Sequence, residues 1–191
     1  MILLTGIVLG LLAAFVRSKI QHRPFIDVEL HGWWLVFLAF IPQALIFGPL
    51  ARLIRTPDVI VPFLFAGSLM LLLCFAWFNY SRAGFKLLGL GLLLNFAAIL
   101  LNGGWMPISP ETVQAMAPKA SPEVYQVNQR LADTKDWIVD EKEMRLSILS
   151  DRFVVPAFRG QAVAFSMGDV LIALGAFWYC YSLSGAQPKE E

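Results

Sequence analysis

Residues 87–101 read LLGLGLLLNFAAILL, a stretch in which Asn95 is the strongly polar position. Comparable apolar runs lie at about residues 2–16, 32–51, 59–78 and 164–183. Hydrocarbon leaves no water to satisfy an open backbone, so long apolar runs separated by polar segments predict membrane-crossing helices. We therefore expect an all-α, polytopic membrane helix bundle with five transmembrane helices.

The composition of the whole chain agrees with this expectation. Of the 191 residues, 58% are hydrophobic and 15% are charged, and the mean hydropathy of +0.65 is high for a soluble domain. A transmembrane β-barrel would alternate apolar and polar residues, and these runs do not. A formal charge of +1 provides no polybasic surface, so we expect membrane lipid as a partner and no nucleic acid.

The polar segment at residues 102–163 divides the last two apolar runs within a single membrane domain, 1–191. It contains most of the acidic residues and no apolar stretch long enough to cross a bilayer. Ser109 and Ser121 each precede a Pro-Glu pair, the pattern of a serine N-cap followed by proline and an acid in the first helical turn. We expect a mostly helical and irregular exterior cap of about 60 residues.

Glycines and prolines inside the apolar runs predict the packing and the shape of the helices. Gly6 and Gly10 are four residues apart, a spacing that favours close helix contact in membranes. Pro42 and Pro49 predict a kink or break in the second helix. Gln43 could serve a site, although an amide in a membrane helix more often bonds a neighbouring helix.

Basic residues in the short loops predict the orientation. Two, Arg52 and Arg55, lie on one side of the predicted bundle. Six lie on the other: Arg17, Lys19, Arg23, Arg82, Lys86 and Lys189. Because positive loops stay inside, we expect a bacterial cell (inner) membrane protein with its N-terminus outside and its C-terminus cytoplasmic.

Asn102, Gly103 and Gly104 follow the fourth predicted helix and form the first candidate binding site. The glycines permit backbone conformations closed to other residues, so their amides could face a ligand. The alternative is a helix C-cap followed by Trp105 as an interfacial anchor.

Asp151 and Asp169 form a candidate catalytic dyad. They are 18 residues apart, a separation that lets the chain loop back so that the carboxylates meet. Paired carboxylates that share a proton can activate water for hydrolysis. Arg152 and Ser166, beside them in sequence, are candidate binding residues. The alternatives are a salt bridge from Asp151 to Arg152 or Arg159, and Asp169 as the N-cap of the last helix.

The common cofactor and metal signatures are missing from the sequence. His22 and His31 are nine residues apart without a convincing second ligand pair. Nucleophile-elbow, dinucleotide-binding and phosphate-loop motifs do not occur. We predict no cofactor and no metal site.

Three features together resemble an uncharacterised family of bacterial multi-pass membrane proteins, a domain of unknown function. These are the glycine-spaced first helix, the turn Asn102-Gly103-Gly104-Trp105-Met106-Pro107 and the stretch from Phe165 to Ile172. The likeness covers almost the whole chain, and it implies a membrane location but no reaction.

Phe165-Ser166-Met167-Gly168-Asp169 is also similar to the Phe-Asn-x-Ala-Asp motif that begins the last helix of lipoprotein signal peptidase. That local resemblance covers about 25 residues. It implies that Asp151 and Asp169 form an aspartyl dyad on the exterior face. Ser166 and Gly168 replace the motif's asparagine and alanine, so neither substrate recognition nor hydrolysis transfers directly.

These patterns favour a binding or subunit-docking protein with an exterior polar site, in contact with lipid or with other membrane subunits. An intramembrane aspartyl hydrolase acting on a lipid-linked or membrane-anchored substrate is the first alternative. A small transporter is the second, although transporters usually repeat their broken helices in two halves.

Overall fold

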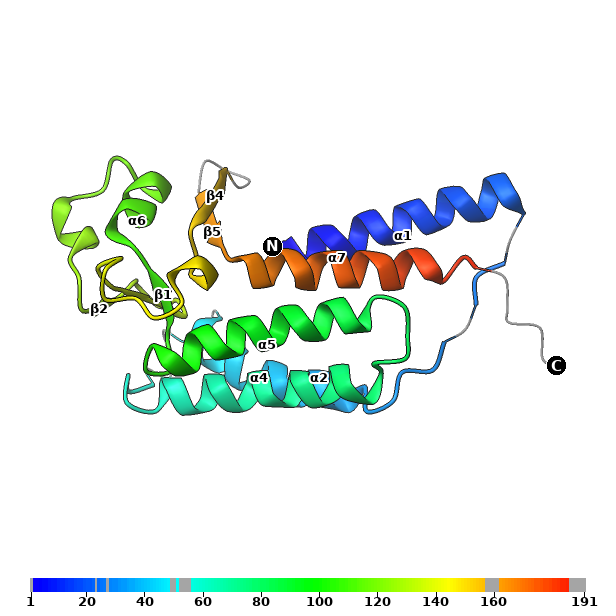
Figure 1. Ribbon diagram of the computed structural model, residues 1–191, viewed down its shortest axis with the longest axis horizontal. Helices are drawn as coiled ribbons and strands as arrows, with labels where there is room; N and C mark the ends of the chain where they lie inside the picture. The colour runs from blue at the N-terminus through cyan, green and yellow to red at the C-terminus, as the bar shows by residue number, and fades with distance from the viewer. Residues whose placement is uncertain are drawn as a thin grey trace.

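The computed structural model describes residues 2–22, 24–26, 28–48, 51, 56–156 and 162–185. Five long helices run along the long axis of the molecule, and a smaller cap covers one end (Figure 1). These helices are α1 (Ile2–Gln21), α2 (Trp34–Phe47), α4 (Val61–Phe78), α5 (Phe85–Leu101) and α7 (Met167–Ser182).

The prediction of an all-α bundle with five transmembrane helices is wrong. Within the described residues, α1 and α4, of 20 and 18 residues, are long and apolar enough to cross a membrane. The other three have 14, 17 and 16 residues. At 1.5 Å per residue these reach roughly 21 to 26 Å, against about 30 Å of hydrocarbon.

The apolar runs predicted some helices to be longer than they are, because apolar residues also form turns and strands. The predicted run 32–51 begins in a turn, and α2 starts only at Trp34. The predicted run 164–183 begins with Ala164 and Phe165, which belong to a strand. Helix α2 continues through Pro42 to Phe47, so this proline does not break it. Pro49 lies outside the described residues.

The cap contains two sheets, where the sequence predicted a mostly helical and irregular segment without strands. Its elements are β1 (Met106–Ile108), α6 (Pro110–Met116), η1 (Pro122–Tyr125), β2 (Gln129–Arg130), β3 (Asp136–Ile138), η2 (Ser147–Leu149), β4 (Phe153–Pro156) and β5 (Ala162–Phe165). Strand β3 is central, parallel to β1 and antiparallel to β2. Strands β4 and β5 pair antiparallel, with Phe153 opposite Phe165.

The two predicted serine caps differ in the structure. Ser109 caps α6, because its hydroxyl accepts a hydrogen bond from the Thr112 amide at 3.2 Å. Ser121 precedes η1, a short 3-10 helix that has no side-chain cap bond. Short helices therefore occur at both predicted places, but they are a small part of the cap.

Helix α7 packs between α1 and α5 through glycines (Figure 1). A Cβ at Gly6 would lie 2.4 Å from the Ala173 carbonyl oxygen, and one at Gly10 would lie 2.6 Å from that of Phe177. The predicted close packing at these two glycines is confirmed. Gly91 of α5 approaches α7 equally closely, because a Cβ there would lie 2.5 Å from the Gly168 oxygen. The contact of Gly91 with Gly168 lies in the first turn of α7, and the other two lie further along this helix.

Candidate binding site between the cap and the bundle

The start of α7 forms a capping box. The Ser166 hydroxyl accepts a hydrogen bond from the Asp169 amide at 3.1 Å, and Asp169 Oδ2 accepts one from the Ser166 amide at 3.2 Å. Each side chain thus satisfies a backbone donor that the first helical turn leaves free. The N-cap is Ser166, and Asp169 occupies the third helical position.

Asn95 of α5 completes this arrangement. Its amide nitrogen donates to Asp169 Oδ1 at 2.8 Å, and its oxygen accepts from the Ser166 hydroxyl at 2.8 Å. Asn95 and Ser166 are buried. Gly168 makes room, because a Cβ there would lie 1.9 Å from Asn95 Oδ1. Hydrogen bonds from Asn95 and Ser166 therefore hold the Asp169 carboxylate in one orientation.

Lys135 brings a positive charge to the same place from the cap. Its backbone carbonyl accepts a hydrogen bond from the Met106 amide at 3.0 Å, next to the pairing of β1 with β3. Its ammonium forms ion pairs with Asp136, at 3.3 Å, and with Asp151. Asp169 is near enough for its charge to act on both Lys135 and Asp151. One ammonium is therefore paired with two carboxylates and lies within the electrostatic reach of a third.

Asp151 is the most enclosed of these carboxylates, with 1% of its side chain exposed. Its amide donates to the Pro107 carbonyl at 3.2 Å, which holds it beside β1. Among the described residues, its Oδ1 atom has no hydrogen-bond partner.

The pKa values of this pair reflect opposing effects of burial and charge. Burial raises the pKa of Asp151 to about 7; Lys135 opposes the rise, and the charges of Asp136 and Asp169 add to it. Burial alone would lower the pKa of Lys135, but the surrounding carboxylates outweigh burial and raise it above its usual value.

A cavity of about 300 Å³ lies between the cap and the bundle and reaches this cluster; we call it the boundary cavity. Its polar lining comes from four side chains: Gln43, Asn95, Lys135 and Asp169. Most of the remaining lining is apolar and includes Leu69, Leu92, Ile99, Met106 and Ile172. This combination of an apolar wall and a few convergent polar groups is typical of a small-molecule site.

Asp151 and Asp169, the predicted dyad, belong to one electrostatic cluster, but Asp169 lines the cavity and Asp151 does not. Lys135 is the ion-pair partner of Asp151, in place of the expected Arg152. Arg159 lies outside the described residues. The catalytic role of the two aspartates, and with it the likeness to lipoprotein signal peptidase, stays a prediction.

The other predicted binding residues lie outside the cavity lining. Arg152 is paired with Glu141 at 3.6 Å on the surface. Ser166 is buried in the capping box. Gly103 and Gly104 form a left-handed turn, with φ of 75° and 88°, as their sequence predicts. Ligand binding by these residues stays a prediction.

Asn102 anchors the cap to α5. Its amide nitrogen donates to the carbonyl oxygens of Ala98, at 2.7 Å, and Arg145, at 2.8 Å, and its oxygen accepts from the Arg145 amide at 3.0 Å. The following Trp105 is buried against Trp137, with ring centroids 5.4 Å apart, and is no surface anchor.

Sequence reasoning missed Lys135 and Asp136 as members of the site. Neither belongs to a motif, and the contact of Lys135 with Asp151 depends on the pairing of strands that were not predicted. Asn95 and Gln43 were visible as polar residues in apolar runs. Gln43 donates to the Ser68 hydroxyl of α4 at 2.9 Å, which confirms the expected bond to a neighbouring helix.

Comparison with known proteins gives a family without an assigned activity. A protein from Thermotoga maritima described as uncharacterised is 26% identical over 176 residues, which cover 92% of this chain and 86% of that protein. No solved structure matches the chain. The model of DUF5317, a family of unknown function, matches residues 27–181. The chain is therefore a member of the DUF5317 family.

Proposed function

We propose that the chain is a membrane protein held in the bilayer by α1 and α4. In the most apolar windows of these helices, 17% and 33% of the residues are buried inside the protein. A core helix of a soluble protein would be mostly buried. Large apolar side chains on several helices of the bundle are exposed, such as Leu12, Phe37 and Phe63. Soluble monomers rarely expose large apolar patches.

The orientation proposed is the one that the basic residues favour. The loop containing Arg82 and the end of α1 with Lys19 lie opposite the cap (Figure 1). Positive residues on that side support a cytoplasmic location for it and an exterior location for the cap. The Thermotoga maritima relative supports a bacterial cell membrane.

The biochemical function proposed is the binding of a small amphiphilic ligand with a cationic, amine-type head. The observation that carries it is the boundary cavity, where the charged side chains of Lys135 and Asp169, with the amides of Gln43 and Asn95, meet an apolar wall. Even when Asp151 is protonated, the carboxylates of Asp136 and Asp169 outnumber the ammonium of Lys135, so the polar end of the cavity has an excess of negative charge. A positive head beside Asp169 would offset this charge, and an apolar body would fill the rest of the cavity.

Thermal unfolding of the full chain in mild detergent tests this binding with three probes: hexylamine, hexanol and hexanoate. The six-carbon body is the same, so differences report the head group. Hexylamine is expected to raise the melting temperature most and hexanoate least. In Asp169→Asn the hexylamine shift should fall to that of hexanol, while Asp140→Asn, an exposed control in the cap, should retain it.

Two results would contradict the proposal. One is an equal shift by all three probes in the unaltered chain, which would indicate partition into detergent. The other is a hexylamine shift that survives Asp169→Asn. Ile172→Trp provides a second variant, because the larger ring should fill the cavity and remove the shift without changing the charge.

A further inference from the structure

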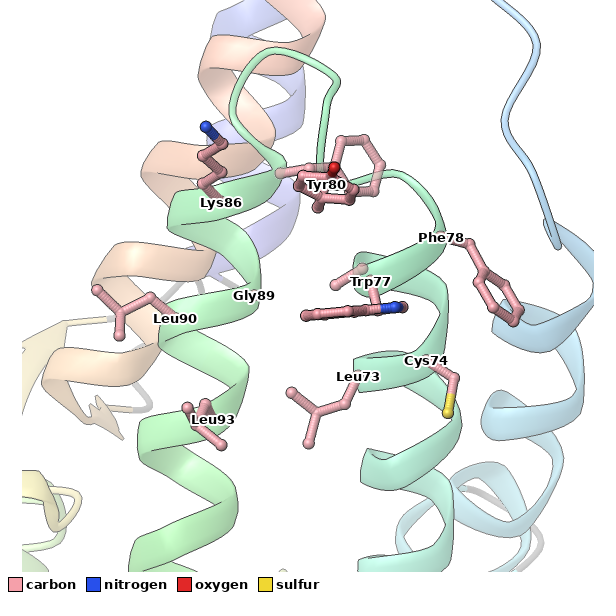
Figure 2. Close-up of a pocket in the computed structure, with 11 residues that line it drawn as sticks. Leu73, Cys74, Trp77, Phe78, Tyr80, Lys86, Gly89, Leu90 and Leu93 are labelled. Atoms are coloured by element: carbon pink, nitrogen blue, oxygen red, sulfur yellow. The ribbon is translucent and has the colours of Figure 1, made fainter.

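A second hollow lies between α4 and α5, near the end of the bundle opposite the cap. Its volume is about 710 Å³. Figure 2 shows the Trp77 ring between the two helices, across from Gly89, with Leu73 and Leu93 deeper along the groove. The lining is almost entirely apolar and shares no residue with the boundary cavity.

The groove exists because the residues at its floor, Gly89 of α5 and Ala76 of α4, are small. A Cβ at Gly89 would lie 3.5 Å from the Cβ of Ala76, an ordinary contact distance. Larger side chains on either side form the walls, and they remain open: Trp77 is 73% exposed and Leu93 is 52% exposed. No described element of the chain covers the groove.

One end of the groove is positively charged. Lys86, on the first turn of α5, contributes to the lining, and Figure 2 shows its side chain extending toward the end of the bundle. Lys86 is exposed and has no ion-pair partner among the described residues. Tyr80 lies at the same end, stacked on Trp77 with ring centroids 5.8 Å apart. Aromatic and basic side chains at one level are typical of a membrane–water interface.

We infer that this groove binds an anionic phospholipid, with one acyl chain between α4 and α5 and the phosphate group near Lys86. The inference rests on the membrane location proposed above. Charge favours this occupant over a second copy of the chain. Two copies with the same orientation would be related by an axis along the bundle, which would bring a second Lys86 to the same end.

Native mass spectrometry of the full chain in mild detergent tests the inference, with phosphatidylglycerol and phosphatidylcholine of identical acyl chains as probes. A basic residue near anionic lipid contributes about 1 kcal/mol, so a preference of about fivefold for phosphatidylglycerol is expected. Lys86→Gln should remove this preference. Lys19→Gln, an exposed control at the end of α1, should leave it unchanged.

Gly89→Leu tests the acyl-chain half of the site. The new side chain begins at an ordinary contact distance from Ala76 and extends into the groove, so binding of both lipids should fall. Equal binding of the two lipids by the unaltered chain would overturn the inference, as would a preference that survives Lys86→Gln. A dimer that Gly89→Leu dissociates, with lipid binding unchanged, would assign the groove to a second copy.

Alkaline carbonate extraction of membranes separates failure of this inference from failure of the membrane proposal. Release of the chain into the soluble fraction would contradict its membrane location. Retention in the pellet together with no lipid preference would contradict the lipid site alone.

Discussion

Gly168 is essential to the packing of the polar cluster formed by Asn95, Ser166 and Asp169. The Asn95 amide occupies the space that a side chain at this position would need. A Cβ at this position would lie 1.9 Å from Asn95 Oδ1. Gly168→Ala is therefore expected to lower the free energy of unfolding by about 1–3 kcal/mol, the usual cost of overpacking. Reversible unfolding in detergent measures it.

Gly67→Ala is the matched control for this substitution. No atom lies within 4 Å of a Cβ at Gly67, so the change should be neutral or stabilising by up to about 1 kcal/mol. Equal effects of the two substitutions would mean that Gly168 does not pack against Asn95.

The start of the last helix could be approached from the sequence, but the polar cluster around it depends on contacts between residues far apart in the chain. The sequence offered Asp169 as the N-cap of the last helix, whereas in the structure Ser166 is the N-cap and Asp169 is the third helical residue. The partner Asn95 is 71 positions from Ser166. No local pattern connects such residues, so the cluster becomes visible only after α5 packs against α7.

The raised pKa of Asp151 predicts how the stability of the protein changes with pH. Its pKa is raised from 3.8 to about 7 by burial, so the folded chain holds this proton more tightly than the unfolded chain does. The stabilisation is present below pH 4 and is lost as the pH rises through about 7.

The free energy of unfolding, measured from pH 4 to 8 for the unaltered chain and for Asp151→Asn, checks this dependence. The unaltered chain should lose stability relative to the variant as the pH rises. A relative gain over the same range would show that the Lys135 ion pair dominates and lowers the pKa.

Two asparagines at the ends of helices connect these helices to distant parts of the chain. Asn102 ends α5 and binds the backbone of Arg145; Asn79 ends α4 and binds the backbone of His31 through bonds of 2.8 and 2.9 Å. Each joins a helix end to a distant loop.

Asn102→Ala removes three hydrogen bonds, which at about 1 kcal/mol each predicts a loss of about 2–3 kcal/mol. Limited proteolysis should also show faster cleavage near Arg145. Gln114→Ala, at an exposed position of α6, is the control and should change neither property. Unchanged proteolysis in Asn102→Ala would mean that other contacts hold the cap.

The strands show why elements of the cap escaped prediction. Strand β2 has two residues, and β1 and β3 have three each, too few to show alternation. The aromatic and β-branched residues of β4 were visible in the sequence. The last two residues of its partner β5, Ala164 and Phe165, were assigned to the last helix because they are apolar. Each of the five long helices overlaps one apolar run, but the bounds differ: α1 extends beyond the predicted residue 16 to Gln21, and α2 ends at Phe47, before the predicted residue 51.

At the scale of the whole molecule, the cap is predicted to face the exterior. Trypsin added to spheroplasts should cleave the chain after Lys119, which is exposed in the cap, while an epitope tag at the C-terminus should remain protected. Cleavage of the tag with an intact cap would reverse the orientation.

Lys135 of the cap and Asp169 of α7 belong to one electrostatic site, so the effects of changing them should be coupled. A double-mutant cycle of Lys135→Met and Asp169→Asn measures this coupling between the cap and the bundle. The two changes together are predicted to cost less unfolding free energy than the sum of the single changes, by more than about 0.5 kcal/mol. Lys142→Met, an exposed cap position, should add independently to Asp169→Asn. Additivity of Lys135→Met and Asp169→Asn would contradict the claim.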